Sequence, residues 1–450
     1  MDITCIGGGG HVTGAQYLLK NASGDMYLVE CGFFQEGDVD EVVFPYNPKD
    51  IKAVFLTHAH IDHSGLIPLL CQRGFEGDIY STEPTKDVAA LLLSDMVKVM
   101  SYEEKEEKGK VLYTQSAVEK AFSQWKTVSY HTPLSVGSLR VSFYNAGHVL
   151  GSASIRIEDS VDGKAVAFSG DLGNQPSVLL KKTEYVSDVD AAFVESAYGG
   201  RIHESIEARG DLLKQTVRDT IHRNGTLLIP SFAFERTQDI LFELNGFFER
   251  KEVPSIPVFV DSPLAIGITT IYEKYVDDPA FFSPEVKEML AIDPEVFRFS
   301  ELTLVHSAQE SIKIQHKEGP KIIIAGAGMS DGGRIRSHYH TYLDRSNTIL
   351  LFVGFQSPGT LGRALLDGVK TITLQRRTIQ VAAERRFISG YSAHADQSLL
   401  LKWVASLGNR TQYVVVVQGE VAQSEALVTR IKEDSALDAV VGEAEKTYHV

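Results

Sequence analysis

The chain has 450 residues, of which 43% are hydrophobic, 9% aromatic and 23% charged. At about 150 residues per domain, this length predicts two or three domains rather than one small one, and the composition excludes a wholly disordered chain. The 44 Lys and Arg residues against 59 Asp and Glu residues give a formal net charge of -15. Non-specific coating of polyanions is therefore excluded, and any nucleic-acid partner needs a local cationic groove.

Cysteine usage and the N-terminal sequence indicate the compartment. Cys5, Cys31 and Cys71 are odd in number and lack C-x-x-C spacing, so we expect no disulfide framework, three small buried hydrophobes and a reducing cytoplasm. The first residues lack the regions of a signal peptide, and no apolar run approaches the roughly 20 residues that span a bilayer. We expect a soluble, cytoplasmic protein without a membrane partner, and the sequence leaves its oligomeric state open.

The first part of the chain predicts sheet layers decorated by helices. From Ile3 to about Ile157, short β-rich runs alternate with turns. A longer helix is expected from Thr85 to about Glu107, where apolar residues recur at helical spacing and a charged run forms a solvated end. The strands expected here include Met26–Cys31, Ala53–Thr57 and Val141–Asn145.

Past about Ser205, helices alternate with apolar strands, a pattern typical of βαβ units with a mostly parallel sheet. From Arg386 to Val450 the pattern returns to short strands, such as Gln412–Val417, with an amphipathic helix from about Ser398 to Ser406. The strands expected in the middle part are Gly225–Pro230, Pro257–Val260, Lys321–Ala325 and Thr348–Val353.

A dense group of metal-ligand residues follows the strand expected to end near Thr57. Residues 58–63 read His-Ala-His-Ile-Asp-His, and imidazole and carboxylate are the ligands that suit zinc. A loop at the end of a strand can direct its members at different positions around a metal pair. Nothing structural requires this density, so we interpret His58, His60, Asp62 and His63 as metal ligands.

Two single residues further along can complete such a site. His148 lies in a glycine-flanked turn after the strand at Val141–Asn145, where glycine lets the backbone approach a site closely. Asp171 follows another apolar run, in Ser-Gly-Asp. Alone, the histidine would be a structural residue and the aspartate a turn residue. Together with the first cluster, both are expected ligands.

The order His-x-His-x-Asp-His, Gly-His, Ser-Gly-Asp resembles the metallo-β-lactamase superfamily. Further motifs resemble its β-CASP branch, which contains ribonuclease J and RNA-processing nucleases of the cleavage-and-polyadenylation type, and the match extends over nearly the whole chain. These further motifs are Glu195-Ser-Ala-Tyr-Gly, the segment from Gly225 to Arg236, Asp261-Ser-Pro-Leu, the segment from Ala325 to Arg334, and Ser392-Ala-His394-Ala-Asp.

The resemblance implies an α/β fold in which a metallo-β-lactamase αββα sandwich is interrupted by an inserted β-CASP α/β domain with a mostly parallel sheet. The expected boundaries are 1–200 for the first part of the sandwich, 201–385 for the inserted domain and 386–450 for the C-terminal part of the sandwich. Single-stranded RNA would enter the cleft between the domains. The glycines at 7–10 would lie beside the metal cleft, since their spacing is not that of a nucleotide-binding loop.

The resemblance also implies roles for individual residues. His58, His60 and His148 would hold one zinc ion, Asp62 and His63 a second, and Asp171 would bridge them. Two metals can share a hydroxide nucleophile and stabilise charge on the phosphate. His394 would act as the general acid and Glu195 would orient its ring. Asp62 could also accept a proton from the nucleophile, although a ligand carboxylate is a weak base.

Four polar residues in the motif-rich turns of the inserted domain are candidates for phosphate binding, because hydroxyls and guanidinium forks bind phosphodiesters well. They are Ser231, Arg236, Ser330 and Arg334. For each arginine, a surface or interdomain ion pair is an equally weighted alternative. The nearby Arg336, His338 and His340 are interpreted as solvated or packing residues.

Two positions depart from the family pattern. Glu30 stands where the family usually has an aspartate that supports the histidine loop, and it keeps the charge. Gln418 stands where a histidine usually completes the second zinc site. Since an amide oxygen is a weaker zinc ligand than imidazole, we expect two zinc sites of which the second is weak.

The leading functional hypothesis is a zinc-dependent RNA phosphodiesterase. Endonucleolytic cleavage is favoured over 5′ exonucleolytic cleavage. The first alternative is a degenerate β-CASP subunit that binds RNA or an assembly partner without cutting, although retention of the other ligands argues against complete loss. A small-molecule hydrolase such as a thioesterase or lactonase shares the metal motif, but it does not explain the inserted domain with Glu195 and His394.

Overall fold

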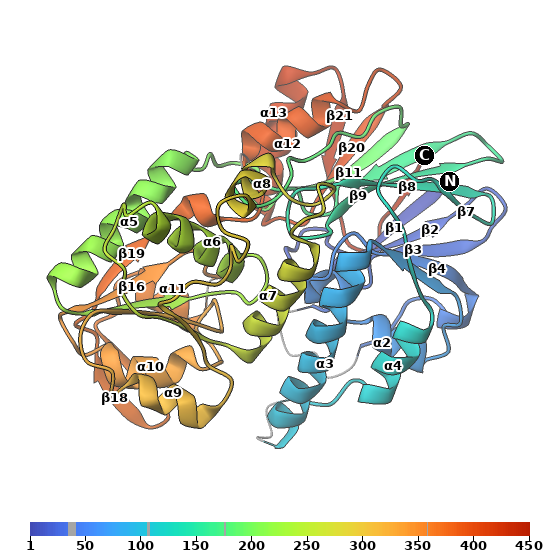
Figure 1. The fold of residues 1–450 in the computed structure, drawn as a ribbon. Helices are drawn as coiled ribbons and strands as arrows, with labels where there is room; N and C mark the ends of the chain where they lie inside the picture. The colour runs from blue at the N-terminus through green and yellow to red at the C-terminus, as the bar shows by residue number, and fades with distance from the viewer. Residues whose placement is uncertain (35–41, 106–108, 175–176, 358) are drawn as a thin grey trace. The chain divides into compact units, whose positions relative to one another are not determined.

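The computed structural model describes residues 1–34, 42–105, 109–174, 177–357 and 359–450, which form two compact units (Figure 1). Unit 1 comprises Met1–Gln175, Leu180–Ile202 and His394–Val450, and unit 2 comprises Pro176–Leu179 and His203–Ala393. The chain returns from unit 2 to unit 1 between Ala393 and His394, which lies beyond the expected boundary at 385/386. The strand β19 (Glu384–Phe387) still pairs with β16 (Thr348–Phe352) in the sheet of unit 2.

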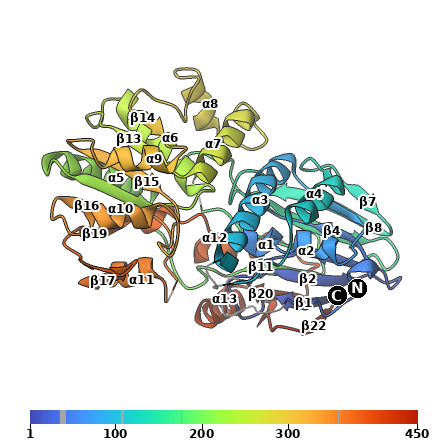
Figure 2. The same cartoon turned by 90° about the horizontal axis from the view of Figure 1, so that it is seen from below.

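Unit 1 contains two seven-stranded sheets of mixed strand direction. The C-terminal segment contributes to both, and β22 beside β1 brings the two chain ends together (Figure 2). The first sheet has the order β22 (Thr447–His449), β1 (Asp2–Gly7), β2 (Gln16–Lys20), β3 (Met26–Val29), β4 (Ile51–Phe55), β5 (Asp78–Ser81), β6 (Trp125–Thr127). The second has the order β21 (Asp438–Val441), β20 (Tyr413–Val417), β11 (Ala191–Glu195), β10 (Ala165–Phe168), β9 (Ala153–Asp159), β8 (Leu139–Asn145), β7 (Leu134–Val136).

Helices cover the outer faces of both sheets, which gives four layers in the order helices, sheet, sheet, helices (Figure 1). One helical layer comprises α1 (Ile61–Ser64), α2 (Ile67–Gln72), α3 (Glu83–Lys105) and α4 (Gln115–Ser123). The other comprises α12 (Gln397–Ala405) and α13 (Val421–Asp434). The αββα sandwich expected from the sequence is therefore confirmed.

Successive side chains of a β-strand point to opposite faces of the sheet, so one apolar strand contributes to two cores. In β20, Val415 and Val417 lie in the core between the sheets, whereas Val414 and Val416 lie in the core between the second sheet and the helices. The second core includes Leu400 and Trp403 of α12, whose N-terminus is capped by the Asp396 side chain.

Unit 2 is a doubly wound α/β fold. Its six-stranded sheet is parallel at every pairing, which confirms the expected parallel insertion. The order is β14 (Leu302–Leu304), β13 (Val258–Asp261), β15 (Lys321–Ala325), β12 (Thr226–Pro230), β16, β19. An antiparallel pair, β17 (Thr371–Leu374) and β18 (Arg377–Gln380), forms a separate ribbon.

Helices lie on both faces of the parallel sheet (Figure 1). One core joins alternate residues of the sheet to α9, α10 and α11, and most of these helices begin at a Ser or Thr whose side chain accepts a backbone N–H, as N-caps do. The helices are α5 (Ile206–His222), α6 (Arg236–Glu249), α7 (Pro263–Tyr275), α8 (Pro284–Leu290), α9 (Ala308–Ile314), α10 (Ile335–Tyr342) and α11 (Leu361–Leu366).

The elements expected from the sequence are present with shifts of a few residues at their ends. The helix expected at Thr85 to Glu107 is α3, and the last two residues of that expectation lie outside the described ranges. Cys5, Cys31 and Cys71 are free and buried, as expected. None of the helices in the described ranges is long and apolar enough to cross a membrane.

Leu400 tests whether the C-terminal segment is part of the core of unit 1. Its side chain is fully buried between α12 and β20, so Leu400→Ala is expected to lower the free energy of unfolding by about 2–5 kcal/mol. Lys402→Ala on the exposed side of α12 should change it little. Urea denaturation followed by circular dichroism measures both, and equal effects would contradict the assignment of this core.

Candidate metal centre

The metal-ligand motif lies where strands of both sheets of unit 1 end. His58 and His60 lie in the loop between β4 and α1, and Asp62 and His63 lie in α1. The loop is held by Ser64, whose hydroxyl donates to the carbonyls of Ala59 (2.9 Å) and His60 (3.0 Å). These contacts keep successive side chains directed at one point.

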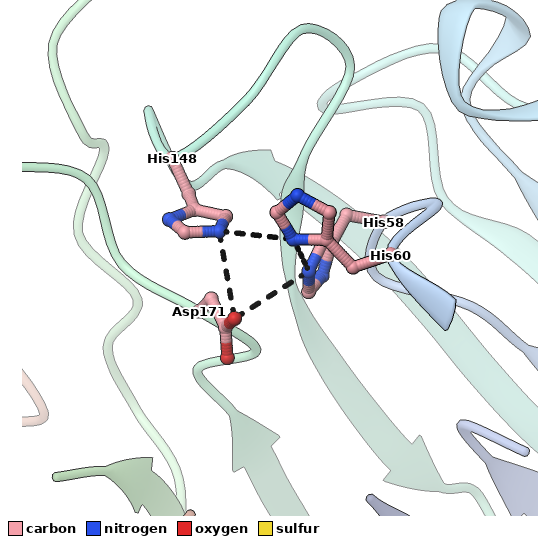
Figure 3. Close-up of side chains that lie close together, drawn as sticks. All are labelled: His58, His60, His148 and Asp171. Carbon is pink, nitrogen blue, oxygen red and sulfur yellow. Dashed lines mark hydrogen bonds and ion pairs between the residues drawn. The ribbon is translucent and has the colours of Figure 1, made fainter. Parts of the chain in front are cut away.

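A four-residue cluster is formed by His58, His60, His148 and Asp171 (Figure 3). His58 Nε2 lies 3.0 Å from His60 Nδ1 and 3.5 Å from Asp171 Oδ2. His148 Nε2 lies 3.4 Å from His60 Nδ1 and 3.5 Å from the same Asp171 oxygen. The structure thus brings together three histidines and the aspartate that the sequence singled out.

This donor set fits a zinc ion. Zn–N and Zn–O bonds of about 2.0–2.1 Å in a tetrahedron place neighbouring ligand atoms about 3.3 Å apart, and the four separations in the cluster are 3.0, 3.4, 3.5 and 3.5 Å. Burial, reinforced by His63, lowers the pKa of His58 well below its usual value. The neutral imidazole is the form that binds a metal.

Two hydroxyl groups lie beside histidines of the cluster. The Thr57 hydroxyl lies 2.9 Å from His58 Nδ1, which leaves the other ring nitrogen of His58 directed at the cluster. The backbone N–H of His148 donates to the Ser152 hydroxyl at 3.1 Å. Neither residue was predicted from the sequence, in which the one signal for Thr57 is its position directly before the histidine motif.

A second group of donors adjoins the first through Asp171. His63 Nε2 lies 3.4 Å from Asp171 Oδ1 and 3.9 Å from Asp62 Oδ2. Burial alone would raise the pKa of Asp171, but His63, His394 and His58 outweigh it and hold that pKa well below its usual value. Asp171 is therefore a carboxylate that faces both donor groups.

Gln418 enters this second group through its amide. Its Nε2 lies 3.1 Å from Asp171 Oδ1 and 2.9 Å from His63 Nε2, and the Tyr17 hydroxyl donates to its Oε1 at 3.2 Å. A carboxylate only accepts hydrogen bonds, and in this orientation the amide nitrogen of Gln418 donates to Asp171 Oδ1. The glycine loop lies alongside, since the Gln418 N–H donates to the Gly8 carbonyl at 2.7 Å.

Glu30 lies behind the histidine loop. Its Oε2 accepts the Thr57 N–H at 3.3 Å, and its Oε1 lies 3.5 Å from His63 Nδ1. Burial raises the pKa of this carboxyl group. The longer glutamate side chain therefore still contacts the histidine loop that it was expected to support.

Glu195 and His394, far apart in sequence, meet beside the first cluster. His394 Nδ1 lies 3.1 Å from Glu195 Oε2 and 3.9 Å from Asp171 Oδ2. The Leu172 N–H donates to Glu195 Oε1 at 2.6 Å, which fixes the carboxylate. Burial opposes a charged ring, but the Glu195 and Asp171 carboxylates outweigh it and raise the pKa of His394 to about 9.

The four phosphate-binding candidates have protein partners within unit 2. Arg236 is buried against Asp239 (2.8 Å), and the hydroxyls of Ser231 and Ser330 lie 3.0 Å from Thr237 Oγ1 and 2.6 Å from the Tyr339 hydroxyl. Arg334 donates to Asp261 at 2.6 Å, and 24% of its side chain remains exposed.

The interpretation of His338 as a packing residue was incomplete. His338 Nε2 lies 2.7 Å from Asp261 Oδ2, and both side chains are fully buried. Arg334 binds the other oxygen of the same carboxylate. Sequence spacing gave no signal for this network, because Asp261 and His338 are 77 positions apart.

Comparisons with known families agree with this geometry. Residues 22–171 match the profile of a metallo-beta-lactamase superfamily domain, residues 237–365 match the Beta-Casp domain, and residues 378–441 match the Zn-dependent metallo-hydrolase RNA specificity domain.

Similar proteins cover most of the chain. "Ribonuclease TTHA0252" of Thermus thermophilus is 32% identical over 422 residues, which are 93% of each chain. The "RNase J-like protein" of Methanocaldococcus jannaschii is 30% identical over 88% of this chain and 87% of its own. "Transcription termination factor FttA" of Methanosarcina mazei is 27% identical over 93% of this chain and 67% of its own. A crystal structure of a protein of unknown function from Enterococcus faecalis shares the fold, with a TM-score of 0.57 at 13% identity over 100% of this chain and 99% of its own.

The chain therefore belongs to the β-CASP family of the metallo-β-lactamase superfamily. It matches the RNA specificity domain of Zn-dependent metallo-hydrolases and contains buried His and Asp clusters, and it is a metal-dependent RNA hydrolase of that type.

Thr57→Val tests the orientation of His58. The substitution keeps the buried side-chain volume and removes the hydroxyl at His58 Nδ1, so zinc affinity is expected to fall about 10- to 100-fold. Competition with a chelator measures the affinity. Thr127→Val, at an exposed position in β6, is the matched control, and an unchanged affinity in Thr57→Val would refute the orienting role.

Proposed function

We propose that the protein is a zinc-dependent ribonuclease that cleaves single-stranded RNA internally, with His394 as general acid. The observation that carries the proposal is the position of the His394 and Glu195 pair against the four-residue cluster, where His394 Nδ1 is 3.9 Å from Asp171 and its ring centroid is 4.6 Å from that of His148. A proton donor beside a metal-ligand cluster suits phosphodiester hydrolysis, because the metal can activate water and the donor can protonate the leaving oxygen.

Zinc held by His58, His60, His148 and Asp171 would supply an activated water near neutral pH and stabilise charge on the phosphate. The protein residues do the rest. His394, with its pKa raised to about 9, carries a proton at neutral pH and gives it to the departing nucleotide oxygen. Glu195 holds the ring through Nδ1, so the opposite nitrogen is the one that donates.

Asp62 has a secondary role in this proposal. It faces the second donor group and is the candidate acceptor for the proton of the attacking water, while its main role is metal binding. Among the phosphate-binding candidates, Arg334 is the one we retain as a direct contact, since part of its side chain is exposed. Ser231, Arg236 and Ser330 would first have to leave their buried partners, so we assign them to loop support.

We further propose that a second cation binds weakly at Asp62, His63 and Asp171. The amide nitrogen of Gln418 donates into this position, and an N–H group cannot bind a cation. To offer its oxygen, the amide would have to turn and exchange its contacts with Asp171 and Tyr17. This supports a second site of lower occupancy than the first.

The Gln418 amide at the second cation position also favours one alternative function, an RNA-binding subunit that does not cleave RNA. If both metals were indispensable, the Gln418 amide would block catalysis while binding persisted. Cleavage of a circular single-stranded RNA by the zinc-loaded protein distinguishes the readings, because only an endonuclease can open a circle. Binding without cleavage would favour the subunit, and cleavage of linear RNA alone would favour an exonuclease.

Two histidine variants separate the acid from the ligand. His394→Ala is expected to lower kcat for RNA cleavage about 10²- to 10⁴-fold with zinc content unchanged, because the ring supplies a proton and is not counted among the metal ligands. His60→Ala is expected to lose both zinc and activity. Zinc analysis and cleavage of labelled RNA are measured on each, with His316→Ala, at an exposed position, as control. Equal zinc loss in both variants would overturn the role of His394.

Gln418→His tests the second cation site. Imidazole is the better zinc ligand, so this variant should bind a second ion more tightly, and its activity should depend less on added Zn²⁺ or Mn²⁺ than that of the unmodified protein. Metal titration with metal analysis at each point is the measurement. Two tightly held ions in the unmodified protein would show that another residue completes the site, and the exposed Glu420 would be examined first.

A further inference from the structure

One exposed aromatic side chain of unit 2 lies at the carboxyl edge of its central parallel strand. Phe232 follows β12 by two residues, and β12 pairs with β15 on one side and β16 on the other. After β12 the chain continues to β13, which lies on the β15 side of β12. After β15 it continues to β16, which lies on the opposite side of β12. This is a topological switch point, where open α/β sheets leave a crevice for ligands.

The strands on both sides make room for the aromatic ring. Gly328 follows β15 and Gly354 follows β16. A Cβ atom at Gly328 would lie 2.6 Å from Phe232 Cδ2, and one at Gly354 would lie 3.1 Å from Cε2. Side chains at these positions would displace the ring, so its place depends on two glycines from separate strand ends.

The backbone under the ring is also fixed. The Thr237 hydroxyl donates to the Phe232 carbonyl at 2.8 Å, and the Ser231 hydroxyl lies 3.2 Å from the same oxygen. Despite this support the side chain is 37% exposed. A large apolar side chain that is held from below and open to solvent offers a flat surface to a ligand.

Two polar groups near this edge have protein partners. The Ser231 hydroxyl is paired with Thr237, and the Asp261 carboxylate, which ends β13, is occupied by Arg334 and His338. What the Phe232 side chain itself offers a ligand is a π face and no charge. Of the parts of an RNA strand, this suits the base and not the phosphate.

We propose that Phe232 stacks against a base of single-stranded RNA and so contributes to substrate binding in unit 2. The inference rests on the proposed ribonuclease function and adds a binding residue to it. Every base presents a π face, so the contact would be tolerant of sequence. It would raise affinity without taking part in the chemical step, which places its effect in KM and not in kcat.

The test compares Phe232→Leu, Phe232→Tyr and the unmodified protein, all zinc-loaded and full-length. Phe232→Leu is expected to raise KM for single-stranded RNA, and Kd by fluorescence anisotropy, about 5- to 150-fold with kcat unchanged. Phe232→Tyr keeps the ring and should bind nearly as well as the unmodified protein. Tyr102→Leu, which removes an exposed aromatic from α3 in unit 1, is the matched control and should change neither constant.

A second probe separates stacking from a structural effect. RNA of the same length without bases is expected to bind equally to the unmodified protein and Phe232→Leu, because the stacking contact is absent from both. Equal weakening of Phe232→Leu toward both RNAs, or unchanged binding of ordinary RNA, would overturn the inference. If the unmodified protein cleaves RNA and Phe232→Leu binds RNA normally, the stacking inference is refuted and the proposed ribonuclease function stands. If the unmodified protein neither binds nor cleaves RNA, the proposed function fails and the contact fails with it.

Discussion

The arrangement of the site depends on one buried carboxylate and the imidazoles around it. Asp171 is 4% exposed, and ring nitrogens of His58, His63, His148 and His394 lie 3.4–3.9 Å from its oxygens. A buried carboxylate is unfavourable unless positive charge or hydrogen bonds compensate it. Asp171 therefore lies at the centre of the first cluster and the second donor group, and His394 adjoins it.

The sandwich of unit 1 makes this convergence possible. The histidine loop follows β4 of the first sheet, whereas His148, Asp171, Glu195 and Gln418 follow or end strands of the second. Because apolar residues from both sheets fill one core, the ends of their strands are held at a constant separation. Side chains on rigid strand ends are positioned more accurately than side chains on long loops.

Gln418 makes the two donor groups unequal, because its amide forms hydrogen bonds within the second group. Tyr17 and Asp171 hold the amide from opposite ends, and the residue has a positive φ of 51°. A non-glycine residue in this region is held there by its surroundings. The amide satisfies the acidic side of the second group by hydrogen bonding, which reduces the electrostatic advantage of a second cation there.

The order and density of the chemical residues allowed the sequence to predict much of the protein. The six-residue histidine motif, His148 and Asp171 predicted the first cluster, because the type of ligand is a property of each residue. Apolar strands that alternate with helices predicted the parallel sheet of unit 2, because this pattern is local in the sequence. The meeting of Glu195 with His394 was expected from family resemblance and not from spacing.

Other features were decided by tertiary packing. Tyr17 and Gln418 are 401 positions apart, and only the pairing of strands brings the hydroxyl to the amide. The protein partners of Ser231, Arg236 and Ser330 likewise were not predicted from the sequence. The two glycines beside Phe232 also come from other strand ends. The sequence by itself determined which chemical groups the protein carries and which strands and helices hold them. The folded chain alone decided which groups are buried against each other and which remain open to a substrate, because burial and hydrogen-bond partnership arise from contacts between distant segments.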